Sequence, residues 1–352
     1  NMFNGKLYTA PITGNSPWAQ LYINNKIFRE AGLVNSDGSI MIPKTWDDVT
    51  HFAETITQKG NGQYYGLGFG NSAFSLLEWW MTVFILGAGS PGGAYNMDYR
   101  VGKFTFGTDR NYVDFMNLFR EWKTKGYFYP DSMSISDEVS RAYFARGKFG
   151  MTIGGVWNQG GWTTLKFTDY SLTTLISPTE TRKGYFAVNP GPTTANFVGI
   201  SSQTKHPDEA WAWYDWLYSI DAGKRYVQWG EDVSIFPQNN DPAQLKFKPF
   251  AQYVGLAPLA LNGPDFTVHN PQTANVQVQA VTPNMGGVMA GYYTGQIKDI
   301  QSAFVDLAAR MQKAQDDGIA AAQKQGFKVS INDYIFPDWD LTKPYVTKPG
   351  QG

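Results

Sequence analysis

Two short stretches of the sequence place indole rings directly beside carboxylate or amide side chains. One is Glu78-Trp79-Trp80 and the other is Trp157-Asn158. Aromatic rings stack on the apolar faces of sugars, while planar amides and carboxylates pair with the surrounding hydroxyl groups. Both stretches therefore suit a concave carbohydrate-binding site. A ring packed in the hydrophobic core is the alternative for each tryptophan.

Four other polar residues are candidates for contacts with such a ligand, and each also has a purely structural explanation. Asn15 and Asn284 stand in turn sequences, where asparagine is an ordinary residue. Asp137 opens an expected helix, whose dipole alone would favour an acid there. Glu231 falls in a loop, where a solvated carboxylate is equally reasonable. These residues complete the set of candidate ligand contacts.

A glycoside hydrolase is the main alternative use of the same residues. Hydrolysis requires two carboxyl groups that face each other about 5 to 10 Å apart, and Glu78, Asp137 and Glu231 are the candidates. Their spacing does not require them to converge. A cell-surface carbohydrate-binding protein is a third possibility, and it predicts a flat apolar patch instead of a closed cleft.

The sequence lacks the motifs of several other functional classes. It contains no G-x-S-x-G nucleophile elbow, no G-x-x-x-x-G-K-[ST] phosphate loop and no H-E-x-x-H zinc motif. Cysteine is absent, which excludes disulfides, thiol catalysis and cysteine-ligated zinc. The histidines, His51, His206 and His269, are scattered. We therefore expect no cofactor, no metal and no catalytic residue.

Composition narrows the range of partners. The 352-residue chain has a net charge of −1 at pH 7 and no run of lysine or arginine, so nucleic acid and an anionic membrane are poor partners. Charged residues make up 17% of the chain and aromatic residues 16%, against about 25% charged in a typical domain. A chain of this length can form two lobes.

The element expected to position Trp157 and Asn158 is a strand over residues 149–153, whose side chains alternate inward and outward. Gly154-Gly155 ends this strand just before the indole. Open α/β sheets bind ligands at the carboxyl ends of their strands. The position therefore suits a ligand contact.

A short helix over residues 137–146 precedes that strand. Its spacing predicts that Val139, Ala142 and Tyr143 are buried, and Gly147 supplies the left-handed stop. Helix, strand and indole thus follow one another along the chain.

The other two indoles lie on a helix expected over residues 74–84. Successive helical residues point about 100° apart, so Glu78, Trp79 and Trp80 cannot share one face. We expect one indole to lie in the core and the other to line a cleft.

Further helices and one hairpin have clear sequence signals. Residues 45–59 and 109–125 each carry one apolar stripe between a capping residue and a glycine. The helix that begins near Pro207 is aromatic nearly all round, which predicts burial on more than one side. The glycine-rich residues 87–107 predict a surface hairpin.

The order of elements over residues 137–162 resembles a signature of the extracellular solute-binding proteins of ABC importers, the maltose-binding-protein-like, carbohydrate-type family 1. Four other stretches resemble landmarks of this family in the same order. They are Gly5-Lys6-Leu7-Tyr8-Thr9-Ala10-Pro11, Leu21 to Gly32, Pro43-Lys44-Thr45-Trp46-Asp47-Asp48, and Gly199 to Trp211. The match is specific because all of these landmarks occur together and in family order.

The resemblance implies an α/β, periplasmic-binding-protein-like fold, with two lobes joined by a hinge and a ligand cleft between them. Crossing strands near residues 8–12 and 196–200 would carry the bend. The implied division is residues 1–10 as the end of lobe one and hinge, 11–195 as lobe two, 196–245 as the return to lobe one, 246–326 as lobe two and closing helices, and 327–352 as a C-terminal tail.

The resemblance also implies a function. Such a protein captures an oligosaccharide by hinge closure and delivers it, as a monomer, to the transmembrane subunits of an ABC permease. It would be lipid-anchored at the extracellular face of the membrane or lie in the periplasm. The first landmark stands at residue 5, so the expected signal peptide, lipid-attachment cysteine and first units of lobe one are absent from this sequence.

Overall fold

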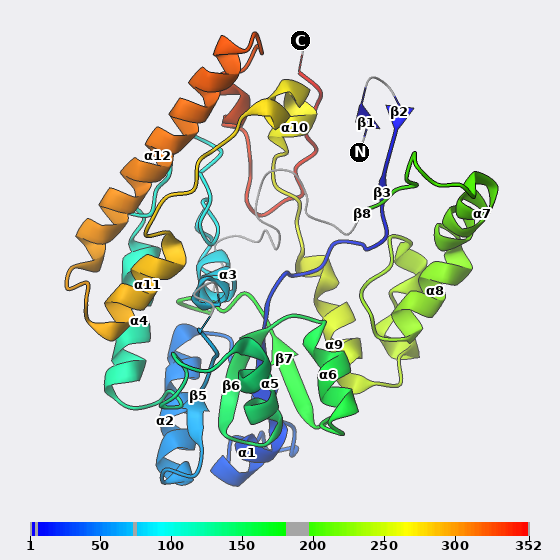
Figure 1. Cartoon of the computed structure of the whole chain (residues 1–352). Helices are drawn as coiled ribbons and strands as arrows, with labels where there is room; N and C mark the ends of the chain where they lie inside the picture. Colours follow the sequence, from blue (N-terminus) through cyan, green and yellow to red (C-terminus); the bar gives the residue numbers. More distant parts are fainter. Residues whose placement is uncertain (1, 4–5, 73–75, 181–196, 351–352) are drawn as a thin grey trace.

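The computed structural model describes residues 2–3, 6–72, 76–180 and 197–350. It is an α/β structure in which helices surround a central mixed sheet (Figure 1), which confirms the predicted fold class. Residues 181–195 of the predicted second lobe lie outside the described residues.

The central sheet positions the candidate site. Its strands are β4 (Gln20–Asn24), β5 (Tyr65–Leu67), β6 (Phe149–Gly154) and β7 (Tyr170–Thr173), in the order β5-β6-β4-β7. β5 and β6 are parallel, with Leu67 opposite Met151, and β4 is antiparallel to both β6 and β7. The carboxyl ends of β5 and β6 therefore share one edge of the sheet with the amino end of β4.

Every residue of β6 is buried, so the predicted strand is present but its predicted alternation is wrong. β6 lies inside the sheet, and four helices contact it. These helices are α1 (Asn25–Ala31), α2 (Trp46–Gly60), α3 (Leu77–Gly87) and α5 (Asp137–Ala145). A strand that is covered in this way carries no polar face.

The two amphipathic helices form as predicted. In α2, the Thr45 side chain accepts a hydrogen bond from the Asp48 backbone N–H, and the Asp48 side chain accepts one in return from the Thr45 backbone N–H. This reciprocal cap begins the helix. Helix α4 (Arg110–Thr124) begins after the cap Asp109 and buries its predicted stripe, including Val113 and Trp122.

Helix α5 buries a different face from the predicted one. Val139 is 39% exposed, whereas Ser140 and Phe144 are buried. The Phe144 ring lies 5.2 Å from the ring of Trp162, measured between centroids. Trp162 belongs to α6 (Asn158–Thr164), so packing between the two helices determines which side of α5 faces inward.

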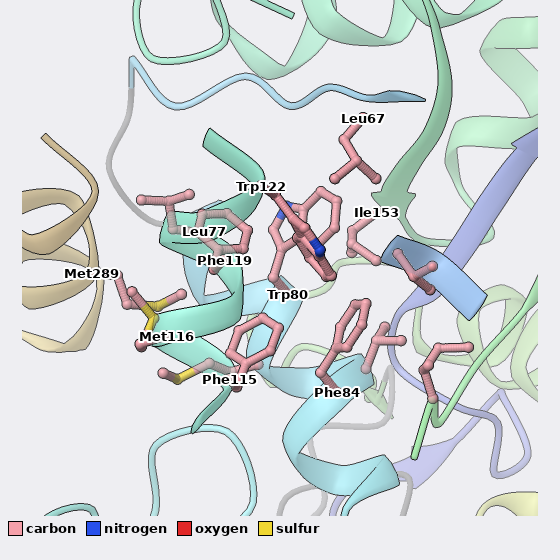
Figure 2. Close-up of a cluster of buried hydrophobic side chains, with 14 of the residues drawn as sticks. Leu67, Leu77, Trp80, Phe84, Phe115, Met116, Phe119, Trp122, Ile153 and Met289 are labelled. Carbon is pink, nitrogen blue, oxygen red and sulfur yellow. The ribbon is translucent and has the colours of Figure 1, made fainter. Parts of the chain in front are cut away.

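An aromatic core lies between α3, α4 and α11 (Met285–Thr294) (Figure 2). Trp80 is 1% exposed and lies 5.4 Å from Phe119 and 6.0 Å from Phe84, centroid to centroid. The long helix α12 (Ile300–Lys324) packs on α4 and α11. This core anchors the first turn of α3, where Glu78 and Trp79 lie.

The two predicted crossing segments pair with each other. β3 (Ala10–Pro11) is antiparallel to β8 (Phe197–Val198), with Ala10 opposite Val198. Helices α7 (Pro207–Leu217) and α8 (Ile220–Gln228) follow β8 and lie beside this pair, at the right of Figure 1. Upstream of β3, β2 (Lys6–Leu7) pairs with β1 (Met2–Phe3).

The prediction that α7 is buried on more than one side is wrong. None of its residues is buried, and Trp211, Trp213 and Trp216 are 60%, 54% and 42% exposed. The helix contacts α8 and little else. Its rings pack on one another instead, with Trp211 stacked on Tyr214 at 5.9 Å between centroids.

The surface hairpin predicted over residues 87–107 is also wrong. Asp98 and Lys103 form an isolated bridge, but most of the segment is buried, including Met97, Tyr99 and Phe106. The C-terminal tail covers part of it, and Phe336 donates a backbone hydrogen bond to the carbonyl of Tyr99. Glycine content indicated turns here but did not show what covers them.

The remaining helices are short. They are α9 (Lys248–Leu256), α10 (Phe266–His269) and the 3-10 helices η1 (Pro237–Asn239), η2 (Pro242–Gln244), η3 (Ala257–Leu259), η4 (Pro271–Asn275) and η5 (Ile331–Tyr334). Helix α9 packs on β7.

Candidate functional site

Three tryptophan rings from distant parts of the sequence pack against one another. The ring centroids of Trp79 and Trp157 are 5.3 Å apart, and Trp18 lies 5.4 Å from Trp157 and 6.4 Å from Trp79. Trp18 and Trp157 are 44% and 43% exposed, and Trp79 is half-buried. We call these three rings the indole cluster.

The carboxyl edge of the sheet positions the cluster. Trp157 stands at the start of α6, directly after β6. Its ring lies over Gly155, where a Cβ atom would come 2.1 Å from the indole. Trp18 precedes β4, whose first residue, Gln20, pairs with Gly154 of β6. Trp18 and Trp157 therefore lie next to the ends of adjacent strands, on the side of the sheet where β6 ends and β4 begins.

Helix α3 supplies the third ring. Trp79 points toward the cluster, while Trp80 points into the core. The two indoles thus separate as the helical spacing predicts. Contact of Trp79, Trp80 and Trp157 with a ligand stays a prediction, and Trp80 is the one of the three that is packed in the core.

Asn158 directly follows Trp157 in the sequence. It is 3% exposed, its side chain packs against Gly154, and its Oδ1 has no hydrogen-bond partner among the described residues. Behind it the Tyr22 hydroxyl donates to the Gly155 carbonyl at 3.0 Å and accepts from Gln159 Nε2 at 3.4 Å. Burial raises the pKa of Tyr22 well above its ordinary value, so the hydroxyl remains a neutral part of this network.

Glu78 faces a different space from its neighbour Trp79. Its Oε1 accepts a hydrogen bond of 2.8 Å from the Gly286 N–H at the start of α11. Burial raises the pKa of this carboxyl, and the Gly286 hydrogen bond opposes that shift. Asn284 caps the same helix, because its Oδ1 accepts from the Gly287 N–H at 2.9 Å.

Glu78 and Asn284 line a cavity of about 660 Å³. Most of its wall is apolar and comes from the segment before α11, from α12 and from residues near 95–104, including Tyr95, Phe104, Val281, Met285 and Met311. The cavity is large enough for a small organic ligand. It adjoins the first turn of α3, the turn that also carries Trp79 of the indole cluster.

The other predicted site residues have local roles. Asp137 forms an ion pair with Arg141 on the same helix. Asn15 is exposed and donates to the Asn262 Oδ1 at 2.8 Å. Glu231 is exposed on the loop after α8. None of these observations tests whether the residue contacts a ligand.

Asp232, the neighbour of Glu231, is the more enclosed acid. It accepts hydrogen bonds from the Tyr253 hydroxyl and, at 2.8 Å, from the Val233 N–H. Burial raises its pKa, and the hydrogen bond from Tyr253 opposes the shift. The Tyr253 hydroxyl is also 2.6 Å from the Ser16 hydroxyl, so this group ties the segment between β3 and β4 to α9.

Sequence reasoning missed Trp18 and Asp232. Trp18 follows Pro17 and directly precedes a buried strand, which was a usable signal, because that strand end lies beside the carboxyl end of its antiparallel neighbour. Asp232 had no comparable signal. Its burial depends on Tyr253, a residue 21 positions away in the sequence.

Each carboxylate considered for hydrolysis has a different local environment in the described structure. Glu78 bonds to α11, Asp137 pairs with Arg141 and Glu231 faces solvent. Over the same described ranges, His, Asp and Glu side chains do not gather in a group of three or more that could hold a metal ion. None of the helices in those ranges combines the length and apolar character needed to cross a membrane.

Several solved structures of solute receptors have a similar fold. The GacH receptor of Streptomyces glaucescens has a TM-score of 0.66 at 14% identity, over 90% of this chain and 73% of the receptor. RafE from Streptococcus pneumoniae has a TM-score of 0.61 at 18% identity, over 89% of this chain and 74% of RafE.

A third similar structure is an ABC transporter solute-binding protein from Thermotoga lettingae, with a TM-score of 0.59 at 19% identity, over 89% of this chain and 74% of that protein. These likenesses show the periplasmic-binding-protein-like fold. No curated protein matches the sequence significantly.

A family model for bacterial extracellular solute-binding proteins matches residues 1–224, which is more than half of the chain. This family consists of non-catalytic solute-binding proteins, and the matched part includes β4, β6, the indole cluster and the paired β3 and β8. The chain therefore belongs to the bacterial extracellular solute-binding protein family.

Proposed function

We propose that this protein is the carbohydrate-capturing component of an ABC importer, with an oligosaccharide as its ligand. The observation that carries the proposal is the indole cluster, in which Trp18, Trp79 and Trp157 meet at the carboxyl edge of the sheet. Partly exposed indoles offer flat apolar faces to sugar rings. The buried amide of Asn158 directly behind them supplies a hydrogen-bonding group.

The ligands bound in similar structures support a sugar. They are acarbose for the GacH receptor, raffinose for RafE and alpha-D-tagatose for the Thermotoga lettingae protein. The candidate contacts are Trp18, Trp79, Trp157, Asn158 and Glu78. Asn15, Asp137, Glu231 and Asn284 are candidates of lower rank, because each has a local partner or a solvated position.

Hinge closure is the proposed mechanism. The paired segments β3 and β8 lie beside the α7–α8 pair (Figure 1). They serve as the crossing strands that carry the bend, and the lobe boundaries are the ones implied by the family resemblance. Ligand that contacts both lobes shifts an open-to-closed equilibrium by its difference in affinity for the two states. The closed form, a monomer held at the outer face of the membrane by a lipid anchor or present in the periplasm, then delivers the sugar to the permease.

The test is thermal melting and calorimetry with a panel of neutral mono- and oligosaccharides. A ligand at about 100 times its dissociation constant should stabilise the protein by roughly 2.7 kcal/mol. Trp157→Ala should weaken the binding of the responding sugar about tenfold or more, a loss of about 1.4 kcal/mol. Trp211→Ala is the matched control, because that indole is 60% exposed but lies outside the cluster.

Whether the sugar recovered after the experiment is intact or cleaved distinguishes a receptor from a glycoside hydrolase. Intact sugar, with weaker binding only in Trp157→Ala, supports the receptor. Cleaved sugar would move the protein to the hydrolases. Equal losses in both variants would remove the indole cluster from the site and favour binding on an exposed aromatic surface.

A further inference from the structure

The loop after α8 carries an acid that joins two segments far apart in the sequence. The Asp232 carboxyl group accepts hydrogen bonds from the Tyr253 hydroxyl and, at 2.8 Å, from the Val233 N–H. The same Tyr253 hydroxyl lies 2.6 Å from the Ser16 hydroxyl, so Tyr253 links the loop to the segment before β4. We call Asp232, Tyr253 and Ser16 the acid clamp.

The two segments that the acid clamp joins also pair through their backbones. The Gly14 N–H donates to the Val233 carbonyl at 2.9 Å, and Thr13 and Ser234 form an antiparallel bridge. The segments are so close that a Cβ atom at Gly14 would lie 2.5 Å from the Ser234 carbonyl oxygen. This pairing begins two residues after β3 ends, so it lies next to that crossing strand.

Neighbouring residues of the loop are anchored on opposite sides. Val233 is fully buried in a hydrophobic cluster that includes Tyr22 of β4 and Tyr253 of α9, and α9 packs on β7. The next residue, Ser234, contacts α8, because a Cβ atom at Gly223 of that helix would lie 2.5 Å from the Ser234 Oγ. The loop thus passes from the central sheet to the α7–α8 pair between Val233 and Ser234.

Three tyrosines and one acid lie near Asp232 in the described structure. The tyrosines are Tyr253 of α9, Tyr226 of α8 and Tyr22 of β4, and the acid is the exposed neighbour Glu231. Burial raises the pKa of Asp232, and the hydrogen bond from Tyr253 opposes that shift. Hydrogen bonds from a hydroxyl and a backbone N–H therefore fix the position of this acid.

A clamp at this place limits how the α7–α8 pair can move. Ser16 leads into β4 and Asp232 precedes the buried Val233, so the clamp holds both segments on the side of the central sheet. Rotation is then confined to β3, β8 and the step between Val233 and Ser234. Without the clamp both segments would sample more orientations, and closure on a ligand would lose more conformational entropy.

We propose that Asp232 is a positioning residue for hinge closure, because with Tyr253 and Ser16 it keeps the ligand-free protein close to the orientation from which it closes. This inference rests on the proposed function for closure on a sugar, whereas the clamp itself acts in the ligand-free protein. Asp232 acts through the two segments that it joins and not by contact with the sugar.

The test replaces Tyr253 by Phe and uses Tyr112→Phe as the matched control. Each substitution removes one buried hydroxyl that donates a hydrogen bond, to Asp232 in the first variant and to the Gly93 carbonyl, at 2.6 Å, in the second. Both variants should therefore melt below the wild type, since each leaves a buried acceptor without its donor.

Only Tyr253→Phe should loosen the two segments. Without sugar, it should show faster hydrogen exchange at the Gly14 N–H and a larger radius of gyration in small-angle X-ray scattering than either the wild type or Tyr112→Phe. It should also bind the sugar that stabilises the wild type about fivefold more weakly or worse, the size of effect expected for one hydrogen bond. Tyr112→Phe should bind that sugar like the wild type.

Two substitutions of Asp232 separate its hydrogen bonds from its charge. Asparagine keeps an oxygen that accepts from both Tyr253 and Val233, so Asp232→Asn should retain sugar affinity within about twofold of the wild type. Asp232→Leu removes the acceptor and should bind the sugar as weakly as Tyr253→Phe. An Asp232→Asn variant that binds as weakly as Asp232→Leu would overturn the proposal.

The clamp and the sugar-binding function fail separately. Unchanged exchange at Gly14 and an unchanged radius in ligand-free Tyr253→Phe would overturn the clamp, whether or not a sugar binds. Faster exchange with unchanged sugar affinity would overturn the role of Asp232 in closure. If no sugar binds the wild type, the proposed function fails, while faster exchange and a larger radius in Tyr253→Phe would still support the clamp.

Discussion

Trp157 has little freedom in where its ring lies. It follows two glycines at the end of a fully buried strand, and its indole rests on the position that a Cβ of Gly155 would fill. The absence of a side chain at Gly155 thus places the ring in the indole cluster.

We therefore expect Gly155→Ala to displace the Trp157 ring and to weaken sugar binding, because the new methyl group would lie 2.1 Å from the indole. Calorimetric titration measures the loss. Gly160→Ala is the control, since a Cβ there meets no atom within 4 Å and alanine favours a helix by about 1 kcal/mol over glycine. Equal affinity in the two variants would contradict the role of Gly155.

The ionisation of Glu78 makes the free energy of unfolding depend on pH. Its ordinary pKa of 4.5 is raised by burial, so above pH 4.5 the folded protein initially holds more protons than the unfolded chain. Stability then falls as the pH rises through the interval between the ordinary and the raised pKa. At neutral pH the fold contains a half-buried carboxylate that accepts a hydrogen bond from the Gly286 N–H.

Replacing Glu78 by Gln keeps the hydrogen bond to Gly286 and removes the charge. The melting temperature of Glu78→Gln should exceed that of the wild type at pH 7, and the difference should shrink as the pH falls from the raised pKa toward the ordinary value of 4.5. Glu231→Gln controls for the change in net charge, because Glu231 is exposed. A difference that does not change with pH would show that the charge of Glu78 is not the cause.

The sequence predicted those features of the candidate site that depend only on neighbouring residues in the chain. Trp157 and Asn158 follow a strand, and helical spacing separates Trp79 from Trp80. Asp232 could not be predicted, because aspartate is mostly exposed in proteins and its burial depends on Tyr253, which is 21 positions away in the sequence.

The position of helix α7 along the sequence was predicted, but its burial was not. Proline and the two acids that follow it predicted where the helix begins, and the structure begins it at Pro207. Burial depends on what lies opposite, and in the described residues its main neighbour is α8. The indoles of α7 are thus exposed in spite of their composition.

Two substitutions test the difference in burial between an indole on α7 and an indole on α3. Trp213→Gln on α7 should change the free energy of unfolding by no more than about 0.5 kcal/mol, as at other surface positions. Trp80→Ala on α3 should lower it by about 3 to 5 kcal/mol, because a fully buried indole is lost. Urea denaturation gives both values, and a large loss in Trp213→Gln would mean that α7 is covered in solution.

Helix ends were more predictable than helix faces. The reciprocal cap of α2 and the left-handed glycines after α1 and α5 involve residues within a few positions of each other. The inward face of α5 was mispredicted, because it depends on Trp162, which lies in another helix. Residues that are close in the sequence thus determine where a helix begins and ends, whereas residues that are distant in the sequence determine which of its faces is buried.

The whole molecule exposes more surface than a compact monomer of its mass. Its accessible surface is 17581 Å² for 39.3 kDa, whereas about 14,200 Å² is expected. The exposed α7–α8 pair and the cavity beside Glu78 contribute to this excess. An open arrangement of this kind leaves room for closure.

Saturation with sugar should therefore reduce the radius of gyration measured by small-angle X-ray scattering. The reason is that closure brings the α7–α8 pair toward the central sheet about the paired β3 and β8. Trp157→Ala at the same sugar concentration should scatter like the ligand-free protein. An unchanged radius in a wild type that binds sugar would exclude closure as the mechanism.

The close packing of Trp18, Trp79 and Trp157 also has an optical consequence. Indoles 5.3 to 6.4 Å apart have electronic transitions that couple, and such coupling produces paired positive and negative bands in circular dichroism. A sugar ring that stacks on these indoles changes their mutual angles and hence the bands. The site thus carries a chromophore that reports its own occupancy, without any attached dye.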